Sequence, residues 1–330
     1  MKLISYRIDT PFGPVTRIGA VDQETQYVDL QLGYQHFLQS RGVSQTAAHR
    51  IASAVLPGNM VDFIEGGDAS RDAATRALSW AGDNPDEAAD ARIRLDPSQV
   101  KLLPPLPTAP LHRDFLAFEA HLKNVYPTLG REIPKEWYDM PVYYKGNPGS
   151  FGAHGDDVLI PYGLQELDYE FEIGMVIGKP GIDIRHEDAL EHVFGFMIYN
   201  DFSQRQVQGH EMAVGLGPAK SKDFAGGHVF GPWLVTIDEL PDVHALRMQS
   251  TINGTPQCDD STASMHWTFE DLIVHASKGE PVAAGEIFGS GTVGLGSGAE
   301  VGKFLQSGDT VELTVEGLGT LRNRVVSQEA

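Results

Sequence analysis

The chain has 330 residues, of which 41% are hydrophobic and 21% charged, and its 45 acidic residues outnumber its 25 lysines and arginines. This length allows one large domain and a smaller one. A formal net charge of −20 repels phosphate backbones and anionic lipids, so we expect neither nucleic-acid nor membrane partners. An anionic metabolite would be repelled in the same way, so any site for one must be made locally positive by arginine, lysine or a metal ion.

The single cysteine, Cys258, excludes an intramolecular disulfide and is typical of a reducing compartment. It lies in the polar, turn-like stretch NGTPQCDD without a second cysteine at redox or metal-binding spacing, so we interpret it as an ordinary thiol. The N-terminal segment MKLISYRIDTPFG lacks the apolar stretch of a signal peptide, and no segment approaches membrane-spanning length. We therefore expect a cytoplasmic protein.

The first hundred residues predict a small α/β domain. Strand-like alternation covers residues 2–8, 14–21 and 26–30, and residues 34–92 are rich in alanine and indicate helices. The proline-rich run LLPPLPTAP at 102–110 then excludes helix and central strand. We place the domain boundary there, with an N-terminal domain over residues 1–103 and a second domain over residues 104–330.

The second domain is predicted to be mostly β. A helix with an apolar stripe is expected over residues 114–125, and a further helix within 264–279. Elsewhere from residue 140 onward, strand patterns alternate with glycine-containing turns. The chain as a whole is therefore predicted to be of the α+β class.

Carboxylates occur where a strand should be apolar, in LDYEFEIGMVIG. Strand alternation places Asp168, Glu170 and Glu172 on one face. Like charges at neighbouring positions repel and lose hydration if buried. Either this face is exposed to water, as is usual for an amphipathic strand, or a cation bridges the carboxylates.

A further carboxylate, Asp201, ends the apolar run FGFMIYND. If FSQRQVQ continues as a helix, Asp201, Arg205 and Gln208 share one face. The simpler interpretation is a helix N-cap aspartate with an arginine salt bridge.

The expected helix over 114–125 would place Asp114 and His121, seven residues apart, on one face. A single histidine beside an apolar stripe is more often a core or surface residue. Lys220 and Lys222, in PAKSKDF, are the remaining basic candidates, although loop lysines are usually only solvated. Acidic residues without a histidine or thiolate at ligand spacing form an all-oxygen set, which favours Mg²⁺, Mn²⁺ or Ca²⁺ over Zn²⁺ or Cu²⁺.

Residues 289–294 match the dinucleotide-binding pattern GxGxxG literally. That fingerprint must open a helix within a βαβ unit, whereas here the remaining residues indicate strands. We interpret it as a glycine-rich loop whose backbone closely approaches another group.

Seven blocks in one order carry a resemblance to a known family: RDFLAFEAH, PVYYKG, DYEFEIGMVIGK, GFMIYNDFSQRQVQ, GPAKSKDFAGGHVFGPWLVT, GSGTVGLG and GDTVELTVEGLGTLRNRVV. Over roughly residues 100–326 the chain resembles the fumarylacetoacetate hydrolase family. The resemblance implies a mixed, rolled β-sheet catalytic domain, a smaller N-terminal α/β domain and a homodimer.

The resemblance also implies site residues. The metal ligands would be Asp114, Glu170, Glu172 and Asp201, holding Mg²⁺, with Mn²⁺ or Ca²⁺ as alternatives, and the catalytic histidine would be His121. Substrate and oxyanion contacts would come from Arg205, Gln208 and Lys222, and further substrate contacts from Tyr144 and Thr292.

Two departures from the family pattern concern the catalytic residues. Family members that cleave fumarylacetoacetate pair the histidine with a glutamate late in the chain, and no counterpart is evident here. Glu119 is close in sequence, but two residues apart on a helix it would point away from His121 unless the helix breaks. The lysine motif has two extra residues, which leaves Lys220 as an alternative to Lys222.

The implied activity is metal-dependent hydrolysis of a C–C bond in a small anionic 1,3-dicarbonyl, acylpyruvate-like oxo-acid through an enolate, with His121 activating water. A decarboxylase, isomerase or hydratase acting on a 2-oxo acid would use the same enolate without that water. A non-catalytic metal-binding relative is the third possibility.

Overall fold

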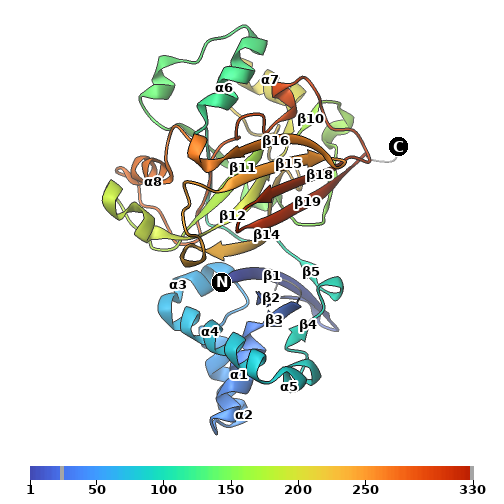
Figure 1. The fold of residues 1–330 in the computed structure, drawn as a ribbon, viewed down its shortest axis with the longest axis vertical. Helices are drawn as coiled ribbons and strands as arrows, with labels where there is room; N and C mark the ends of the chain where they lie inside the picture. Colours follow the sequence, from blue (N-terminus) through green and yellow to red (C-terminus); the bar gives the residue numbers. More distant parts are fainter. Residues whose placement is uncertain (23–25, 328–330) are drawn as a thin grey trace. The chain divides into compact units, whose positions relative to one another are not determined.

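The computed structural model describes residues 1–22 and 26–327 of the chain (Figure 1). The chain divides into two compact units, Met1–Thr108 and Ala109–Ala330. The division falls inside the proline-rich run at 102–110, where the sequence predicts the boundary.

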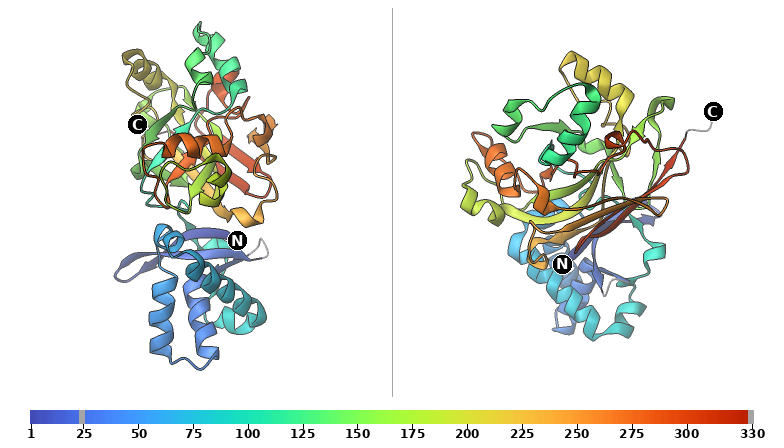
Figure 2. Two further views of the ribbon diagram at one scale, coloured as in Figure 1. Left: turned by 90° about the vertical axis from the view of Figure 1, so that its left-hand side faces the viewer. Right: turned by 45° about the horizontal axis from the view of Figure 1, so that its top comes forward.

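The first unit is a small antiparallel sheet with helices on one face (Figures 1 and 2). Its strands, in the spatial order β4-β3-β2-β1-β5, are β1 (Lys2–Thr10), β2 (Gly13–Asp22), β3 (Gln26–Asp29), β4 (Arg94–Leu95) and β5 (Lys101–Leu102). Its helices are α1 (Leu30–Ser40), α2 (Gln45–Val55), α3 (Met60–Glu65), α4 (Gly67–Asp83) and α5 (Pro85–Asp90).

Local sequence explains where these helices begin. The side chains of Asp29, Ser44 and Asn59 accept hydrogen bonds from the first-turn amides of α1, α2 and α3. Helices α1 and α4 pack closely because Gly33 faces Ala77, where an added Cβ would lie 3.2 Å from the alanine methyl group.

The second unit contains a large mixed sheet in the order β14-β12-β11-β17-β6-β7, with β8 beside β14. The β17–β6 and β14–β8 pairs are parallel, and the β11–β12, β12–β14, β11–β17 and β6–β7 pairs are antiparallel. Its strands are β6 (His112–Phe115), β7 (Tyr143–Gly146), β8 (Phe151–Ala153), β11 (Phe171–Ile177), β12 (Val193–Asp201), β14 (His228–Thr236) and β17 (Ile287–Gly289).

A second sheet packs against β12 and β14, and a short strand pair lies apart from both sheets. The second sheet, in the order β16-β15-β18-β19-β9, contains β9 (Asp157–Leu159), β15 (Arg247–Ile252), β16 (Thr255–Ser261), β18 (Thr310–Val315) and β19 (Gly319–Val326). The short pair is β10 (Leu167–Asp168) with β13 (Ser203–Gln204). The helices of this unit are α6 (Glu119–Val125), α7 (Arg205–Val214) and α8 (Phe269–Ser277). The core between the sheets includes Ile198, Val235, Leu313 and Leu321.

The predicted α+β class, with a mixed sheet in the second unit, is confirmed. The helix expected over 114–125 is wrong in its first half, because Asp114 lies in β6, whose backbone pairs with both β17 and β7. The helix begins only at Glu119. Ladder pairing with distant strands here overrides the local helical pattern.

The stretch around Cys258 is also a strand rather than a turn. Asn253 and Gly254 alone connect β15 to β16, and Cys258 is buried in β16 with its thiol directed at the Gly294 carbonyl, 3.3 Å away. Burial raises the pKa of this thiol to about 12, as expected for an unreactive cysteine.

Among the described residues, no helix is long and apolar enough to cross a membrane.

Candidate active site

Buried strands carry the predicted carboxylates into one place. Glu172 lies in β11 and Asp201 at the end of the neighbouring strand β12, while Asp114 lies in β6. Every residue of β11 and β12 is buried, and Glu172 and Asp201 are only 1% and 0% exposed. The interpretation that this strand face is exposed to water is therefore wrong.

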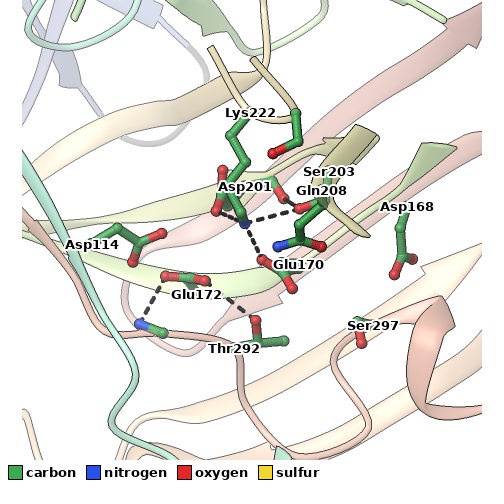
Figure 3. A network of polar contacts seen from close by, with 12 residues as sticks. Asp114, Asp168, Glu170, Glu172, Asp201, Ser203, Gln208, Lys222, Thr292 and Ser297 are labelled. Carbon is green, nitrogen blue, oxygen red and sulfur yellow. Dashed lines mark hydrogen bonds and ion pairs between the residues drawn. The ribbon is translucent and has the colours of Figure 1, made fainter. Parts of the chain in front are cut away.

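Three of the carboxylates converge. One oxygen from each of Asp114, Glu172 and Asp201 lies within 4.8 Å of the other two (Figure 3). Glu172 accepts hydrogen bonds from the Gly291 amide at 2.8 Å and from Thr292 Oγ1 at 3.3 Å. Asp114 Oδ1 is buried without a hydrogen-bond partner in the described part of the chain. Such an orphaned oxygen calls for a ligand, because an unpaired buried acceptor is costly.

The fourth predicted ligand, Glu170, lies beside this group and is paired with cations. Lys222 Nζ donates to Glu170 Oε2 at 2.5 Å, to Ser203 Oγ at 2.9 Å and to Asp201 (Figure 3). Lys222 is 3% exposed, whereas the Lys220 side chain is exposed. The structure therefore places Lys222, and not Lys220, among the carboxylates.

Arg205 and Gln208 lie at the start of α7, next to Glu170. Arg205 Nη2 donates to Glu170 Oε1 at 2.7 Å, and Arg205 Nη1 donates to Gln208 Oε1 at 2.9 Å. The residue that caps α7 is Gln204, so the N-cap interpretation of Asp201 is wrong. Asp201 ends strand β12 instead.

Tyr144 and His228 also contact Asp201. Tyr144 donates to Asp201 Oδ2 at 2.9 Å, and His228 Nδ1 lies 3.1 Å from Asp201 Oδ1. On its other side His228 Nε2 lies 3.0 Å from the partly exposed Asp223. Sequence reasoning missed His228, because only the register of β12 with β14 places it opposite Asp201.

The charges in this cluster do not balance. Five buried carboxyl groups belong to Asp114, Asp168, Glu170, Glu172 and Asp201. Three cationic side chains pair with members of this set: Arg205, Lys222 and His228. Asp114 and Glu172 therefore form no ion pair with a cationic side chain of the described residues, and a divalent cation would supply the opposite charge to both.

The pKa values show where the excess lies. Burial and repulsion from neighbouring carboxylates raise the pKa of Asp114 and of Glu172 well above the usual range. Burial would also raise the pKa of Asp201, but Lys222 and His228 hold it well below its usual value. Burial opposes ionisation of Glu170 too, yet Arg205 and Lys222 lower its pKa, and His121 contributes in the same direction. An all-oxygen set with two uncompensated charges fits a hard divalent cation.

His228 should make the stability of the chelator-treated protein depend on pH. Burial lowers its pKa, but Asp201 and Asp223 outweigh this and raise the pKa from 6.5 to about 9. The stabilisation is therefore complete below about pH 6.5 and is lost as pH rises through about 9, by an amount on the order of 3 kcal/mol. Urea unfolding should show the free-energy difference between wild type and His228→Gln shrinking across this window. A pH-independent difference would contradict the assignment.

His121, on α6, has a partner that sequence reasoning did not identify. Its Nδ1 atom lies 2.9 Å from Oε1 of Glu300, and the two side chains are 8% and 0% exposed. Glu300 Oε2 accepts from Asn124 Nδ2 at 2.6 Å and from the Leu295 amide at 2.7 Å. A buried imidazole oriented by a fixed carboxylate is suited to accept and return a proton.

Glu119, the sequence-based alternative, does not contact His121. It pairs with Lys123 at 2.8 Å and accepts from Tyr138 at 2.7 Å, because residues two apart on α6 point in different directions. The available signal for Glu300 was its place as the first acidic residue after Thr292 in the run GSGTVGLGSGAE.

The glycine-rich segment closely approaches the carboxylates, as predicted. An added Cβ at Gly289 would lie 2.4 Å from Asp114 Oδ1, and the Gly291 amide binds Glu172. Only glycine allows strand β17 to pass this close to Asp114.

Comparisons with known proteins agree with this arrangement. The family profile described as fumarylacetoacetate (FAA) hydrolase C-terminal matches residues 111–326. Oxaloacetate tautomerase YisK of Bacillus subtilis (strain 168) is 32% identical over 274 residues, which cover 82% of this chain and 87% of that protein.

Solved structures share the fold. Fumarylacetoacetate hydrolase (EaFAH) from psychrophilic Exiguobacterium antarcticum superposes with a TM-score of 0.71 at 23% identity, covering 99% of this chain and 100% of that chain. Maleylpyruvate hydrolase from Sphingobium sp. SYK-6, in complex with manganese (II) ion and pyruvate, gives a TM-score of 0.65 at 19% identity, with 100% of both chains covered. The resemblance inferred from the sequence is thus confirmed, and the chain belongs to the fumarylacetoacetate hydrolase family.

Proposed function

We propose that this protein is a divalent-cation-dependent hydrolase that cleaves a C–C bond in a small acylpyruvate-like oxo-acid. The observation that carries the proposal is the buried His121–Glu300 pair, with a separation of 2.9 Å, near a cluster of carboxylates. Hydrolysis needs a base to activate water, and a carboxylate-oriented imidazole is such a base.

Asp114, Glu172 and Asp201 would hold the cation, with Glu170 beside them, and we propose Mg²⁺ as its identity, with Mn²⁺ as the alternative. The charge excess and the oxygen-only donor set support this choice, and the manganese complex of a structural relative agrees with it. When bound, the cation supplies positive charge that stabilises the enolate oxygen of the substrate.

Arg205, Gln208 and Tyr144 line this cluster and are proposed to orient the anionic substrate. The bound cation would offset the negative charge of the cluster, and Arg205 and Lys222, although paired with carboxylates, are the cationic side chains beside it that an anionic substrate would meet. Thr292, which donates to Glu172, is proposed to position that carboxylate and to contact substrate.

His121 would act as the base, with Glu300 fixing its ring orientation. His121 takes a proton from water as the water oxygen adds to the distal carbonyl carbon. The C–C bond then breaks with its electron pair passing to the methylene carbon, which yields a carboxylic acid and the enolate of the 2-oxo acid. The proton held by His121 returns to that carbon, so that the acid and the 2-oxo acid are released and one water is consumed.

Keto–enol tautomerisation of a 2-oxo dicarboxylate is a second candidate. The 32% identical relative carries that activity in its name, and Arg205 and Lys222 are both engaged with carboxylates rather than free to stabilise a tetrahedral oxyanion. This reaction needs His121 for proton transfer but needs no activated water. Decarboxylation, isomerisation and hydration use the same enolate.

A small substrate panel distinguishes these reactions. The protein is first dialysed against EDTA and then assayed with added Mg²⁺ or Mn²⁺ on acetylpyruvate, fumarylpyruvate and oxaloacetate. Carboxylic acid plus pyruvate supports hydrolysis, and loss of the ultraviolet absorbance of enol oxaloacetate without mass change supports tautomerisation. Release of carbon dioxide supports decarboxylation. Absence of turnover on the whole panel, or full activity after EDTA dialysis, would contradict the proposal.

A further inference from the structure

Asp168 is a fully buried carboxylate that receives five hydrogen bonds and has no part in the reaction as proposed above. Its Oδ1 accepts from the Gly298 amide at 2.7 Å and from its neighbour Tyr169 at 2.9 Å. Its Oδ2 accepts from the Ala299 amide at 2.9 Å and from Arg205 at 2.9 Å and 2.7 Å. Asp168 thus joins two segments far apart in the sequence.

One of these segments reaches the carboxylate cluster. Arg205, which donates two hydrogen bonds to Asp168, also donates to Glu170 at 2.7 Å. Glu170 in turn accepts from Lys222. The Asp168 carboxylate therefore sets the position of the guanidinium that contacts the cluster.

The other segment carries the partner of the base. Gly298 and Ala299 are the two residues before Glu300 in one 3₁₀ turn, and Glu300 contacts His121. The approach to Asp168 is close: an added Cβ at Gly298 would lie 2.6 Å from Asp168 Oδ1 and 1.8 Å from the Lys303 carbonyl. Glycine is therefore required at this contact, and the turn is held by its backbone amides.

The choice of a carboxylate at residue 168 is informative. Burying a charge is costly, and the three backbone amide donors alone would be satisfied at lower cost by a neutral acceptor. A carboxylate is needed because the same side chain must also accept the charged guanidinium of Arg205 in two hydrogen bonds. Asp168 therefore holds the turn that carries Glu300 and the Arg205 guanidinium at fixed positions relative to each other.

We propose that Asp168 is a positioning residue that couples the Glu300 turn to Arg205, and thereby holds the His121 base in register with the carboxylate cluster. This inference rests on the proposed function for the role of His121. Asp168 acts through Glu300 and Arg205 and does not contact substrate.

A double-mutant cycle tests the coupling. Asp168→Asn keeps the side-chain shape but loses the charge that Arg205 requires, and kcat is expected to fall about 10- to 100-fold, as for other residues that orient a functional group. In a Glu300→Gln background the same change should cost less than in the wild type, because the part of its effect that acts through Glu300 is already lost. Multiplicative losses in the double variant, or wild-type kcat in Asp168→Asn, would overturn the proposal.

Asp29→Asn is the matched control for general destabilisation. Asp29 is also buried, accepts two hydrogen bonds from one arginine, Arg17, and accepts a backbone amide, but it lies in the first unit. It should lower the midpoint of thermal unfolding without changing kcat below that temperature. If Asp29→Asn reduced kcat as strongly as Asp168→Asn, the effect would be one of stability and the positioning role would be rejected.

A second pair of variants leaves every charged group intact, in case Asp168→Asn does not fold. Ala299→Pro removes one of the two amide donors that the Glu300 turn supplies to Asp168, whereas Ala299→Ser retains it. We expect kcat to fall in the proline variant and to stay at the wild-type level in the serine variant. Equal kcat in both variants would overturn the proposal.

A measurement without turnover separates this inference from the proposed function. ¹H–¹⁵N NMR of the imidazole nitrogens should show a protected Nδ1 proton that disappears in His121→Gln and is therefore assigned to the Glu300 hydrogen bond. This signal should be lost in Ala299→Pro or Asp168→Asn and kept in Asp29→Asn. If wild type turned over no substrate of the panel, the proposed function would fail, and an unchanged signal in these variants would separately overturn the coupling.

Discussion

Replacing Asp201 is expected to abolish divalent-cation binding and turnover together. Asp201 is one of three converging carboxylates, and it is completely buried. Loss of a direct ligand should cost more than the roughly 100-fold that removal of an outer-shell partner costs. Calorimetric titration with Mn²⁺ and the substrate panel, run on the same preparation, measure the two effects.

Two variants keep this result interpretable. Asp201→Ala also leaves Lys222 and His228 without a counter-charge, so Asp201→Asn, which keeps the side-chain size, should accompany it. Asp157→Asn, at an exposed aspartate paired with Arg324, should retain both cation binding and activity. Wild-type cation affinity in Asp201→Asn would show that the cation binds elsewhere.

Replacing His121 is expected to stop hydrolysis while leaving cation binding intact. The imidazole lies 2.9 Å from Glu300, and His121 does not belong to the group of side chains that converge as possible cation ligands. Loss of a general base typically costs about 10²- to 10⁴-fold in rate, so kcat of His121→Ala should be at least about 100-fold lower than that of the wild type. Titration with Mn²⁺ should give the wild-type affinity.

The control for this result is on the same helix. Glu119→Gln should retain wild-type kcat because Glu119 contacts Lys123 and Tyr138 and not His121, whereas Glu300→Gln should lose activity. Undiminished acylpyruvate cleavage in His121→Ala would contradict water activation by this residue. Activity lost in Glu119→Gln and kept in Glu300→Gln would contradict the pairing.

Much of the second unit follows from periodicity in the sequence. The runs that became β11, β12, β14, β18 and β19 are apolar or strictly alternating, and their type was predicted directly. The segment around Asp114 was not, because its apolar spacing fits a helix as well as a strand. Pairing of Asp114 with Gly289 and Tyr144 decides between them, and these partners lie far away in the chain.

For the site too, the sequence predicted part of the arrangement and contacts between distant residues decided the rest. The residue types and their order predicted an oxygen-rich group of Asp114, Glu170, Glu172 and Asp201, and the structure brings three of them together. The spacing of the lysines left two candidates, and burial places Lys222 among the carboxylates. His228 gave no signal, since a histidine next to glycines has no pattern that points to a carboxylate.

The sequence by itself therefore determined which side chains are candidate cation ligands, that their ligand atoms are oxygens, and which family the chain resembles. Only the tertiary structure decided the pairings: the His121–Glu300 contact joins residues 179 apart, and the Lys222–Glu170 contact joins residues 52 apart. The physical reason is that helix and strand periodicity acts over a few residues, whereas a hydrogen bond acts over about 3 Å of space. In the sequence the four carboxylates are recognisable only as charges within or beside apolar strand patterns. They form a candidate site only when the fold brings β6, β11, β12 and the glycine-rich loop together.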